Sequence, residues 1–373
     1  MPREEAESWL RVTLPLGIPP SVLRALLRAM GGPAGVLARR DAVASLAGSE
    51  AARALLEGPD PTLVESTMRW LDQESHHLLT WGDSRYPALL LQIANPPPVL
   101  YVAGRLDLLA APAFAIVGSR NATTQGAQDA HSLARALSAA GVTIVSGLAL
   151  GIDAAAHRGG LAESGSSIAV MGTGPDVVYP AQNRDLAAAL ARDGCLVSEF
   201  PVGTAARAGN FPRRNRLISG MSKGVLVVEA ALASGSLTTA RRALEQNRDV
   251  FAVPGSIHSP LTKGCHWLIK EGAKLVENAG DILSELGWPA QPANDCIDER
   301  ASRDAVLDAM AFDPVSLEQL AERTGFAMPE LAARITRLEL QSRIAALPGG
   351  RFQRVEARVR AREKRDAADG VIE

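Results

Sequence analysis

The stretch AFAIVGSRNATTQGAQDAHSLARALSAAGVTIVSG (residues 113–147) decides the fold class. It begins and ends with short apolar runs, 113–118 and 142–147, and its middle, 126–141, has apolar residues at helical spacing. A strand that is apolar at every position is buried on both faces of its sheet, and strands that alternate with helices pair in parallel. The stretch therefore predicts part of a parallel sheet with helices on both faces.

The same alternation continues along the chain. Helical segments over 183–194 and 237–247 lie among further apolar runs, which are SSIAVMG (166–172), CLVSEF (195–200), GVLVVEA (224–230), DVFAVPG (249–255) and AKLVEN (273–278). Strands and helices at this spacing predict an α/β domain over residues 79–288, an extended Rossmann-like doubly wound, mostly parallel sheet. Ligands of such sheets bind beyond the carboxyl ends of the strands, where helix N-termini present free N–H groups.

The segment before this sheet has a different pattern. Residues 1–78 have apolar residues at helical spacing and predict an N-terminal all-helical domain. In SVLRALLRAMGGPAGVLARR (21–40), we expect Ser21 to cap a helix and Gly31 and Gly32 to end it. The segment that follows contains PPP at 96–98, which excludes a helix and indicates an edge strand or a covering loop.

The segment after the sheet predicts a second folded part. Residues 289–297 have the composition of a linker, and 298–356 contain helical segments, with Ser316 as a cap and Pro329 as an opening residue. Two β-like runs around Pro348 then indicate a hairpin. This order of elements predicts a C-terminal winged-helix domain, and residues 357–373 form a charged tail.

Composition excludes several classes of protein. A chain of 373 residues is too long for one core and suggests several domains. Its three cysteines, Cys195, Cys265 and Cys296, are widely spaced and form neither a zinc pattern nor a disulfide framework, as in a reducing cytoplasm. No apolar run approaches the roughly 18 residues that indicate a membrane helix. We expect a cytoplasmic protein without a cofactor, a metal or a membrane contact.

Two turns have the chemistry of a phosphate site. Gly118, Ser119 and Arg120 follow the first strand of the predicted sheet. The second turn opens a helix and combines backbone N–H groups, hydroxyls and the positive end of the helix dipole. Its candidate residues are Ser234, Gly235, Ser236, Thr238 and Thr239. By contrast, SGLALGID (146–153) is expected to be mainly structural, with Asp153 capping a helix.

A third candidate segment, FPRRNRLISGMSKG (211–224), is basic and contains no acid. No acid occurs between Glu199 and Glu229, although the whole chain has a net charge of −2. A carboxylate within about 8 Å of a phosphate opposes its binding, and the planar arginine side chain meets phosphate oxygens two at a time. Because Arg213, Arg214 and Arg216 lie between two strand ends, we expect their side chains to reach the same edge as the other two turns. Lys223 is the fourth candidate cation of the segment.

These motifs stand in an order that resembles the DNA-processing protein A family (DprA, also called Smf). The resemblance covers about Tyr86 to Leu286 and includes YPALLLQIANPPPVLYVAG, AIVGSR, VSGLALGIDAAAH, IAVMGTGPDVVYP, FPRRNRLISGMSKGVLVVEA, SGSLTTARRALEQNRDVFAVPG and GCHWLIKEGAKLV. It implies a cytoplasmic bacterial protein that binds single-stranded DNA, forms a homodimer and loads RecA recombinase during natural transformation, opposing single-strand-binding protein. Members of this family are not known as enzymes.

The resemblance also implies roles for particular residues. DNA contacts fall on the Arg120 turn, on the basic segment and on the SGSLTT loop (234–239). Self-association falls on GCHWLIKEGAKL, with His266, Ile269 and Leu275 as the expected contacts. The N-terminal segment is similar to a helix-hairpin-helix region but lacks its G-x-G. After YP, many relatives have a basic residue where this chain has Ala181.

Two other functions are compatible with parts of the sequence. One is a nucleotide-processing enzyme like the phosphoribohydrolases that resemble lysine decarboxylase, in which Glu199 or Glu229 could act as an acid or base. Their motif, P-G-G-x-G-T-x-x-E, aligned at Thr238, places Arg241 where the glutamate is required, which favours binding over hydrolysis. The other is a winged-helix transcription factor with a ligand-sensing middle domain.

Overall fold

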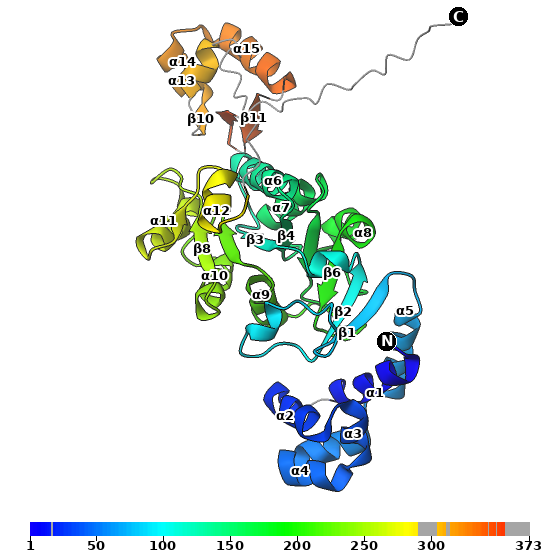
Figure 1. Ribbon diagram of the computed structural model, residues 1–373. Coiled ribbons are helices and arrows are strands. Elements are labelled where there is room, and N and C mark those ends of the chain that lie inside the picture. Colours follow the sequence, from blue (N-terminus) through cyan, green and yellow to red (C-terminus); the bar gives the residue numbers. More distant parts are fainter. Residues whose placement is uncertain (16–17, 290–303, 311–313, 342, 348, 355–373) are drawn as a thin grey trace, which may run out of the picture. The chain divides into compact units, whose positions relative to one another are not determined.

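The computed structural model describes residues 1–15, 18–289, 304–310, 314–341, 343–347 and 349–354 (Figure 1). The chain divides into two compact units, residues 1–293 and 294–373. Most of the predicted linker and the whole charged tail lie outside the described residues.

A nine-stranded sheet with the order β1-β2-β6-β5-β4-β3-β7-β8-β9 forms the centre of the first unit. All neighbours from β6 to β9 are parallel, and β1 and β2 add an antiparallel edge. Each of the predicted apolar runs contains one of the strands, so the doubly wound sheet is confirmed. The strands are β1 (His76–Thr80), β2 (Val99–Gly104), β3 (Ala113–Val117), β4 (Thr143–Ser146), β5 (Ser167–Val170), β6 (Cys195–Ser198), β7 (Gly224–Val227), β8 (Asp249–Ala252) and β9 (Lys274–Leu275).

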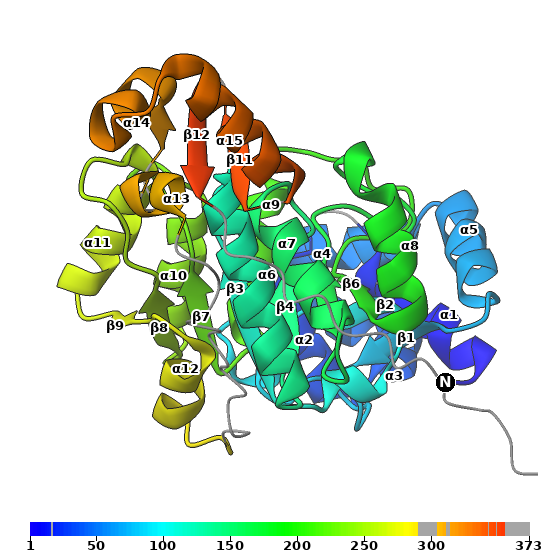
Figure 2. The same ribbon diagram turned by 90° about the horizontal axis from the view of Figure 1, so that it is seen from above.

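Helices cover both faces of the sheet because alternate strand residues supply two cores. Phe114 and Ile116 of β3 pack under α6, α7 and α12, whereas Ala115 and Val117 pack under α9, α10 and α11. Figure 2 shows α6, α7 and α8 over the near face. The helices are α6 (Thr124–Ala139), α7 (Ile152–Leu161), α8 (Arg184–Asp193), α9 (Asn210–Gly220), α10 (Ser236–Glu245), α11 (Lys263–Lys270) and α12 (Ala279–Glu285).

The N-terminal segment forms helices, as predicted: α1 (Arg3–Thr13), α2 (Pro20–Met30), α3 (Pro33–Ala38), α4 (Arg40–Glu57) and α5 (Pro61–Leu71). The expected Ser21 cap is wrong, because α2 begins at Pro20, whose fixed φ and missing N–H suit a first helical position. Gly31 ends the helix with a left-handed φ of 75°, as expected.

The three prolines at 96–98 lie in a loop, and β2 starts directly after them. This strand is internal to the sheet, between β1 and β6, so only the covering-loop alternative applies to the prolines. Three arginines hold this loop region by its carbonyl groups: Arg24 donates to Ala94, Arg216 to Asn95 and Arg248 to Leu89.

The second unit has the predicted helices followed by a hairpin. The Ser316 hydroxyl caps α14 by accepting from the backbone N–H of Gln319, and Pro329 lies in the first turn of α15. The elements are α13 (Ala305–Met310), β10 (Val315–Ser316), α14 (Leu317–Thr324), α15 (Met328–Leu340), β11 (Ile344–Leu347) and β12 (Arg351–Arg354), with strand order β10-β12-β11. In the described parts of both units, no helix has the length and apolar character needed to cross a membrane.

Candidate nucleic-acid interface

The chain reverses its direction of winding between β3 and β7. From β3 it proceeds outward to β4, β5 and β6, and then returns to β7 on the other side of β3 before continuing to β8 and β9. Loops that leave neighbouring strands in opposite directions open a crevice at the carboxyl edge, where doubly wound proteins bind ligands. We call the loops at this edge, together with the first turn of α9, the rim; they are residues 118–120, 147–151, 171–180, 199–211, 228–235 and 253–259.

The turn after β3 is closely packed at its glycine. A Cβ atom on Gly118 would lie 2.6 Å from Ile152 Cγ1 and 2.9 Å from the Glu229 carbonyl oxygen. Only glycine therefore allows this turn to lie against β7 and α7 at the crevice. The turn leaves the neighbouring Arg120 exposed to solvent.

Arg120 begins a row of adjacent side chains from three different elements. Its guanidinium carbon lies 5.6 Å from the ring centroid of Phe211 on α9. The Phe211 ring lies in turn 5.5 Å from that of Tyr179, which follows β5 and is 47% exposed. We call Arg120, Phe211 and Tyr179 the stacking row. A cation over an aromatic face is attractive, and exposed aromatic rings are the surfaces on which unpaired bases stack.

Two further cations contact one carboxylate beside this row. Glu199, at the end of β6, is buried, and its Oε2 accepts from both Arg213 and Arg216. Arg213, at 3.1 Å, has a side chain that is 55% exposed and lies over the Phe200 ring. Arg216 is only 18% exposed, and burial lowers the pKa of its guanidinium. Glu199 thus orients arginines, and of the two only Arg213 has an open side toward solvent.

Arg214 and Lys223 do not lie where the sequence analysis expected them. Arg214 is 4% exposed and donates to the carbonyl oxygens of Gly147 and Val170 beneath the rim. Lys223 is exposed, but its backbone N–H donates to Ala113 at the amino end of β3, on the opposite edge of the sheet. The basic segment is mostly the crossover helix α9, whose 11 residues extend about 16 Å and carry the chain from one edge to the other.

The SGSLTT loop opens a helix, as predicted. Gly235 is the exposed N-cap of α10, and the Ser234 and Ser236 hydroxyls are 2.7 Å apart. Thr238 is half-buried, and Thr239 is buried on the side that faces the core. The exposed residue of this loop is therefore Gly235, at the positive end of the helix dipole, and Ser234 directly before it is half-buried.

Glu229 occupies the position that a phosphate takes in many nucleotide-binding proteins. Its carboxylate accepts from the Thr123 N–H at 2.9 Å and from the Thr123 hydroxyl at 2.6 Å, at the N-terminus of α6. A Cβ on Gly126 would lie only 2.3 Å from the carboxylate carbon, so the group lies directly against the helix. The protein's own carboxylate fills the anion position after the first parallel strand, and the sequence analysis did not foresee this use of Glu229.

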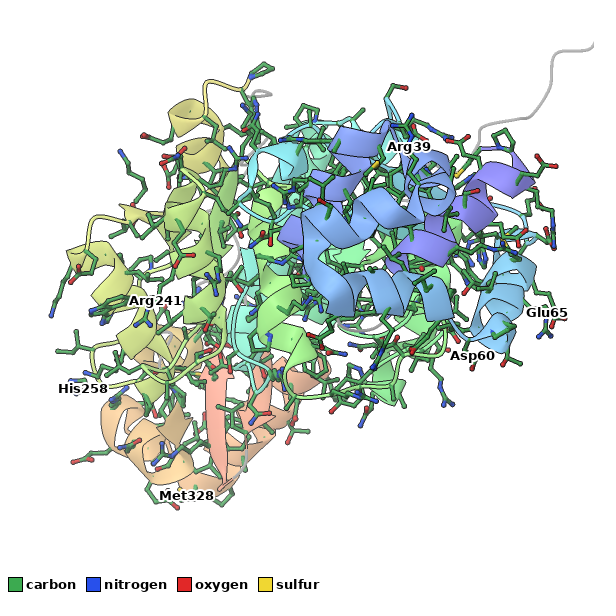
Figure 3. The ribbon with its side chains drawn as sticks, turned by 90° about the horizontal axis from the view of Figure 1, so that it is seen from below. Arg39, Asp60, Glu65, Arg241, His258 and Met328 are labelled. Carbon is green, nitrogen blue, oxygen red and sulfur yellow. The ribbon has the colours of Figure 1, made fainter. Side chains whose placement is uncertain are left out.

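The rim also exposes apolar side chains. Leu150 follows β4, Leu232 follows β7 and Ile257 follows β8, and all three are exposed. Figure 3 labels two exposed polar neighbours in the segments after β7 and β8, which are Arg241 on α10 and His258. The rim thus exposes apolar side chains as well as the cation Arg120, which suits a ligand with both apolar faces and negative charges.

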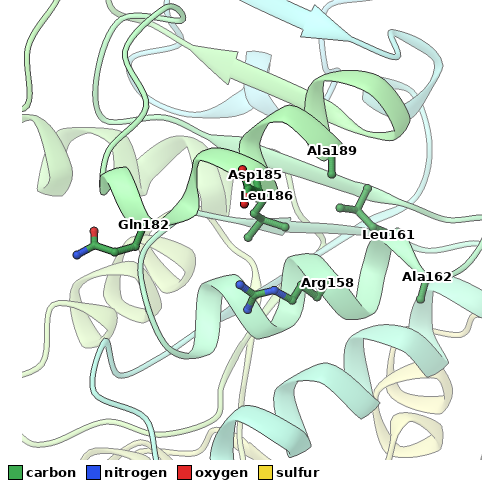
Figure 4. Close-up of a pocket in the computed structure, with 7 residues that line it drawn as sticks. All are labelled: Arg158, Leu161, Ala162, Gln182, Asp185, Leu186 and Ala189. Carbon is green, nitrogen blue, oxygen red and sulfur yellow. The ribbon is translucent and has the colours of Figure 1, made fainter.

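A separate pocket of about 430 Å³ lies between α7 and α8 (Figure 4). Leu161 and Leu186 give it an apolar floor, and Arg158 and Asp185 are its charged members. This lining contains no nucleophile beside a base, the arrangement that nucleophilic catalysis requires. Among the described residues, no group of three or more histidine, cysteine or acidic side chains could hold a metal ion.

The expected self-association residues lie at the far edge of the sheet. Leu275 is exposed on the edge strand β9, and Ile269 on α11 is half-buried against the core. The His266 Nε2–H donates to the Gly255 carbonyl oxygen at 3.0 Å.

Comparison with known proteins assigns a family to this arrangement. Residues 77–287 match the model of the DNA recombination-mediator protein A family, and residues 281–350 match that of the DprA winged helix domain, which confirms the winged helix. Over 298 residues the chain is 45% identical to the protein Smf of Escherichia coli, covering 77% of this chain and 80% of that one. It is 47% identical over 204 residues to the DNA processing protein DprA of Streptococcus pneumoniae, covering 55% and 72%.

Two solved structures are also similar. The X-ray structure of DNA processing protein A from Streptococcus pneumoniae has a TM-score of 0.67 and 36% identity, covering 76% of this chain and 98% of that one. A structure of the Helicobacter pylori protein that describes its single-stranded DNA binding mode has a TM-score of 0.52 and 30% identity, covering 56% and 95%.

Proposed function

Because the chain belongs to the DNA recombination-mediator protein A family, we propose that it binds single-stranded DNA along the rim and loads RecA recombinase onto it. The observation that carries this proposal is the stacking row at the crevice between β3 and β7. A guanidinium that can meet a phosphate lies directly over an aromatic ring that can meet a base. Single strands expose both groups, whereas duplexes keep their base faces stacked inside.

Phosphate contacts are assigned to the groups that solvent reaches on the rim. They are the Arg120 side chain with its turn, Gly118 and Ser119, the exposed side of Arg213, and the α10 N-terminus at Ser234 and Gly235. Arg216 contributes charge from a largely buried position. Ser236, Thr238 and Thr239 are assigned to shaping this terminus, and Lys223 is left out because it lies at the opposite edge. A rim of this kind has no base code, so we expect weak sequence preference.

The proposal includes no chemical step on the DNA. Both carboxylates considered for acid–base chemistry are bound to other groups: Glu199 to two arginines, and Glu229 to Thr123 at the helix terminus. The Glu229 carboxylate also fills the position at the N-terminus of α6 that a nucleotide phosphate would need. We therefore place the protein among binding proteins and not among nucleotide-processing enzymes.

We further propose that the protein acts in the cytoplasm as a homodimer, with RecA as its partner and single-strand-binding protein as its competitor. The dimer is assigned to the surface formed by α11 and β9, where Leu275 exposes an apolar side chain on an unpaired strand edge. An exposed edge strand is a ready template for pairing with a second chain. RecA loading is supported by family membership.

The direct test is a comparison of single-stranded and duplex oligonucleotides of one sequence by fluorescence anisotropy at several salt concentrations. We expect the single strand to bind more tightly at each concentration, and RecA filaments to form faster on DNA coated with single-strand-binding protein when this protein is added. Equal affinity for the two DNA forms would contradict the proposed site, and unchanged filament formation would contradict the loading role.

A further inference from the structure

Arg214 has a different role from Arg213 and Arg216, the other two arginines of the basic segment. We propose that it is a positioning residue, a buried guanidinium that holds the loop 147–151 in place under the Arg120 turn without touching DNA. This inference rests on the proposed function, because the turn that Arg214 supports is the one assigned to phosphate binding. It separates Arg214 from Arg213, next to it in the sequence and more than half exposed.

The loop 147–151 needs outside support because its backbone is strained. Leu148 has a φ of 57°, a conformation that costs a residue other than glycine about 1–2 kcal/mol. Asp153 Oδ2 accepts from the N–H groups of Gly147 (3.1 Å) and Ala149 (3.4 Å). Asn183 donates its side-chain amide to the Leu148 and Ala149 carbonyl oxygens. The Gly147 and Ala149 N–H groups and the Leu148 and Ala149 carbonyl oxygens are thus engaged inside the protein, and this part of the loop is assigned no phosphate contact.

His157 completes the support from below. The Ser167 hydroxyl donates to Ile144 O, so it accepts from His157 Nδ1 at 2.7 Å, and Nε2 is left to accept from the Leu148 N–H at 3.2 Å. The imidazole is therefore neutral with its proton on Nδ1. Burial lowers its pKa to about 3, and the charge of Arg214 adds to the shift.

Arg214 holds the same loop from the other side. Its Nη1 donates to Gly147 O at 2.6 Å and to Val170 O, so one nitrogen joins the carboxyl ends of β4 and β5. A Cβ on Gly147 would lie 2.2 Å from that nitrogen, which shows how closely the guanidinium fits. Burial lowers the pKa of Arg214 to about 10, and the Asp153 carboxylate opposes this shift. The side chain remains charged at neutral pH.

The loop in turn contacts the Arg120 turn directly. A Cβ on Gly151 would lie 2.3 Å from Ser119 O and 2.7 Å from Arg120 O, and the Ile152 N–H donates to Ser119 O at 3.1 Å. A displacement of the loop would therefore move the peptide that carries the Arg120 side chain. Arg214 acts on the DNA site through this packing.

The test separates positioning from contact by the salt dependence of binding. Each phosphate contact on a single strand contributes about −0.7 to the slope of log K against log salt, and we call a slope lowered when it becomes less steep. We expect Arg214→Met to weaken DNA binding about tenfold while its slope stays equal to that of the wild type. Arg214→Lys should recover most of the affinity, because one ammonium can donate to both carbonyls that Nη1 serves. Arg120→Ala should lower the slope.

A destabilised control excludes a general folding effect. Leu137→Ala removes a fully buried side chain near the far end of α6 and should lower the melting temperature without weakening DNA binding. Three results would each overturn the inference. Arg214→Met could lower the salt slope as Arg120→Ala does, or it could bind DNA with wild-type affinity. The third is an Arg214→Lys variant that binds DNA no more tightly than Arg214→Met. If Arg214→Met does not fold, Arg214→Gln decides, because its amide can donate to a carbonyl without carrying a charge: a lowered slope overturns the inference, and an unchanged slope supports it. Wild-type protein that binds no single-stranded DNA would instead overturn the proposed function itself.

Discussion

Arg120→Ala and Lys223→Ala form a matched pair that tests where the DNA lies. Both residues are exposed cations, but Arg120 lies on the rim and Lys223 directly precedes β7 at the opposite edge of the sheet. A hydrogen bond to a charged group contributes about 1.5–3 kcal/mol, so removing one at Arg120 should weaken binding by about tenfold to a hundredfold. The negative slope of log K against log salt should become less steep by about 0.7 for each phosphate that the variant no longer binds. Lys223→Ala should change neither quantity measurably.

The assay is fluorescence anisotropy with a labelled thymidine oligonucleotide, titrated with each variant at four or more salt concentrations. Thermal unfolding checks that both variants are folded, and both side chains are exposed, so little stability should be lost. If Lys223→Ala lowers the slope as much as Arg120→Ala does, the DNA follows the whole basic segment and the rim assignment is wrong.

Three further predictions test other parts of the account. Phe211→Ala should weaken single-strand binding by about 1–3 kcal/mol for each base that no longer stacks on the row, and the salt slope should not change. Phe211→Leu should weaken binding less. A lowered salt slope in Phe211→Ala would contradict a base contact. Because the pKa of buried His157 is about 3, below that of an unfolded histidine at about 6.5, the unfolded state takes up a proton first. The contribution of His157 to the free energy of unfolding should therefore be fully present above about pH 6.5 and decline toward pH 3. In urea unfolding, the stability of His157→Gln should decline less steeply over this range. Parallel pH profiles of the two proteins would refute the neutral state of buried His157. Leu275→Glu should convert the dimer to monomer in sedimentation velocity, whereas Leu46→Glu, at another exposed leucine, should not.

The sheet could be predicted because its strands are apolar on both faces and recur with helices between them. The placement of α9 could not be predicted in the same way, since the basic segment was interpreted as a connection between two strand ends. A helical signal was present: Arg214, Leu217, Ile218 and Met221 follow the i, i+3, i+4, i+7 spacing, and all four are buried. That spacing places Arg214 on the same helix face as three apolar residues.

Lys223 could also have been placed from the sequence. It directly precedes the apolar run GVLVVEA, and a residue before a parallel strand lies at the amino edge, away from the ligand side. The stacking row had no comparable signal. Phe211 and Tyr179 are far apart along the chain, and only the crossing of α9 over the end of β5 brings their rings within 5.5 Å. Glu229 likewise showed its contact with Thr123 only once the fold had placed β7 beside β3.

The structure of the protein bound to a short oligothymidine tests the central claim most directly. We predict backbone phosphates within hydrogen-bonding distance of the Arg120 and Arg213 side chains and of the Gly235 N–H, with at least one base against Phe211 or Tyr179. An oligonucleotide bound along the amino edge near Lys223, or held only by the second unit, would contradict the claim.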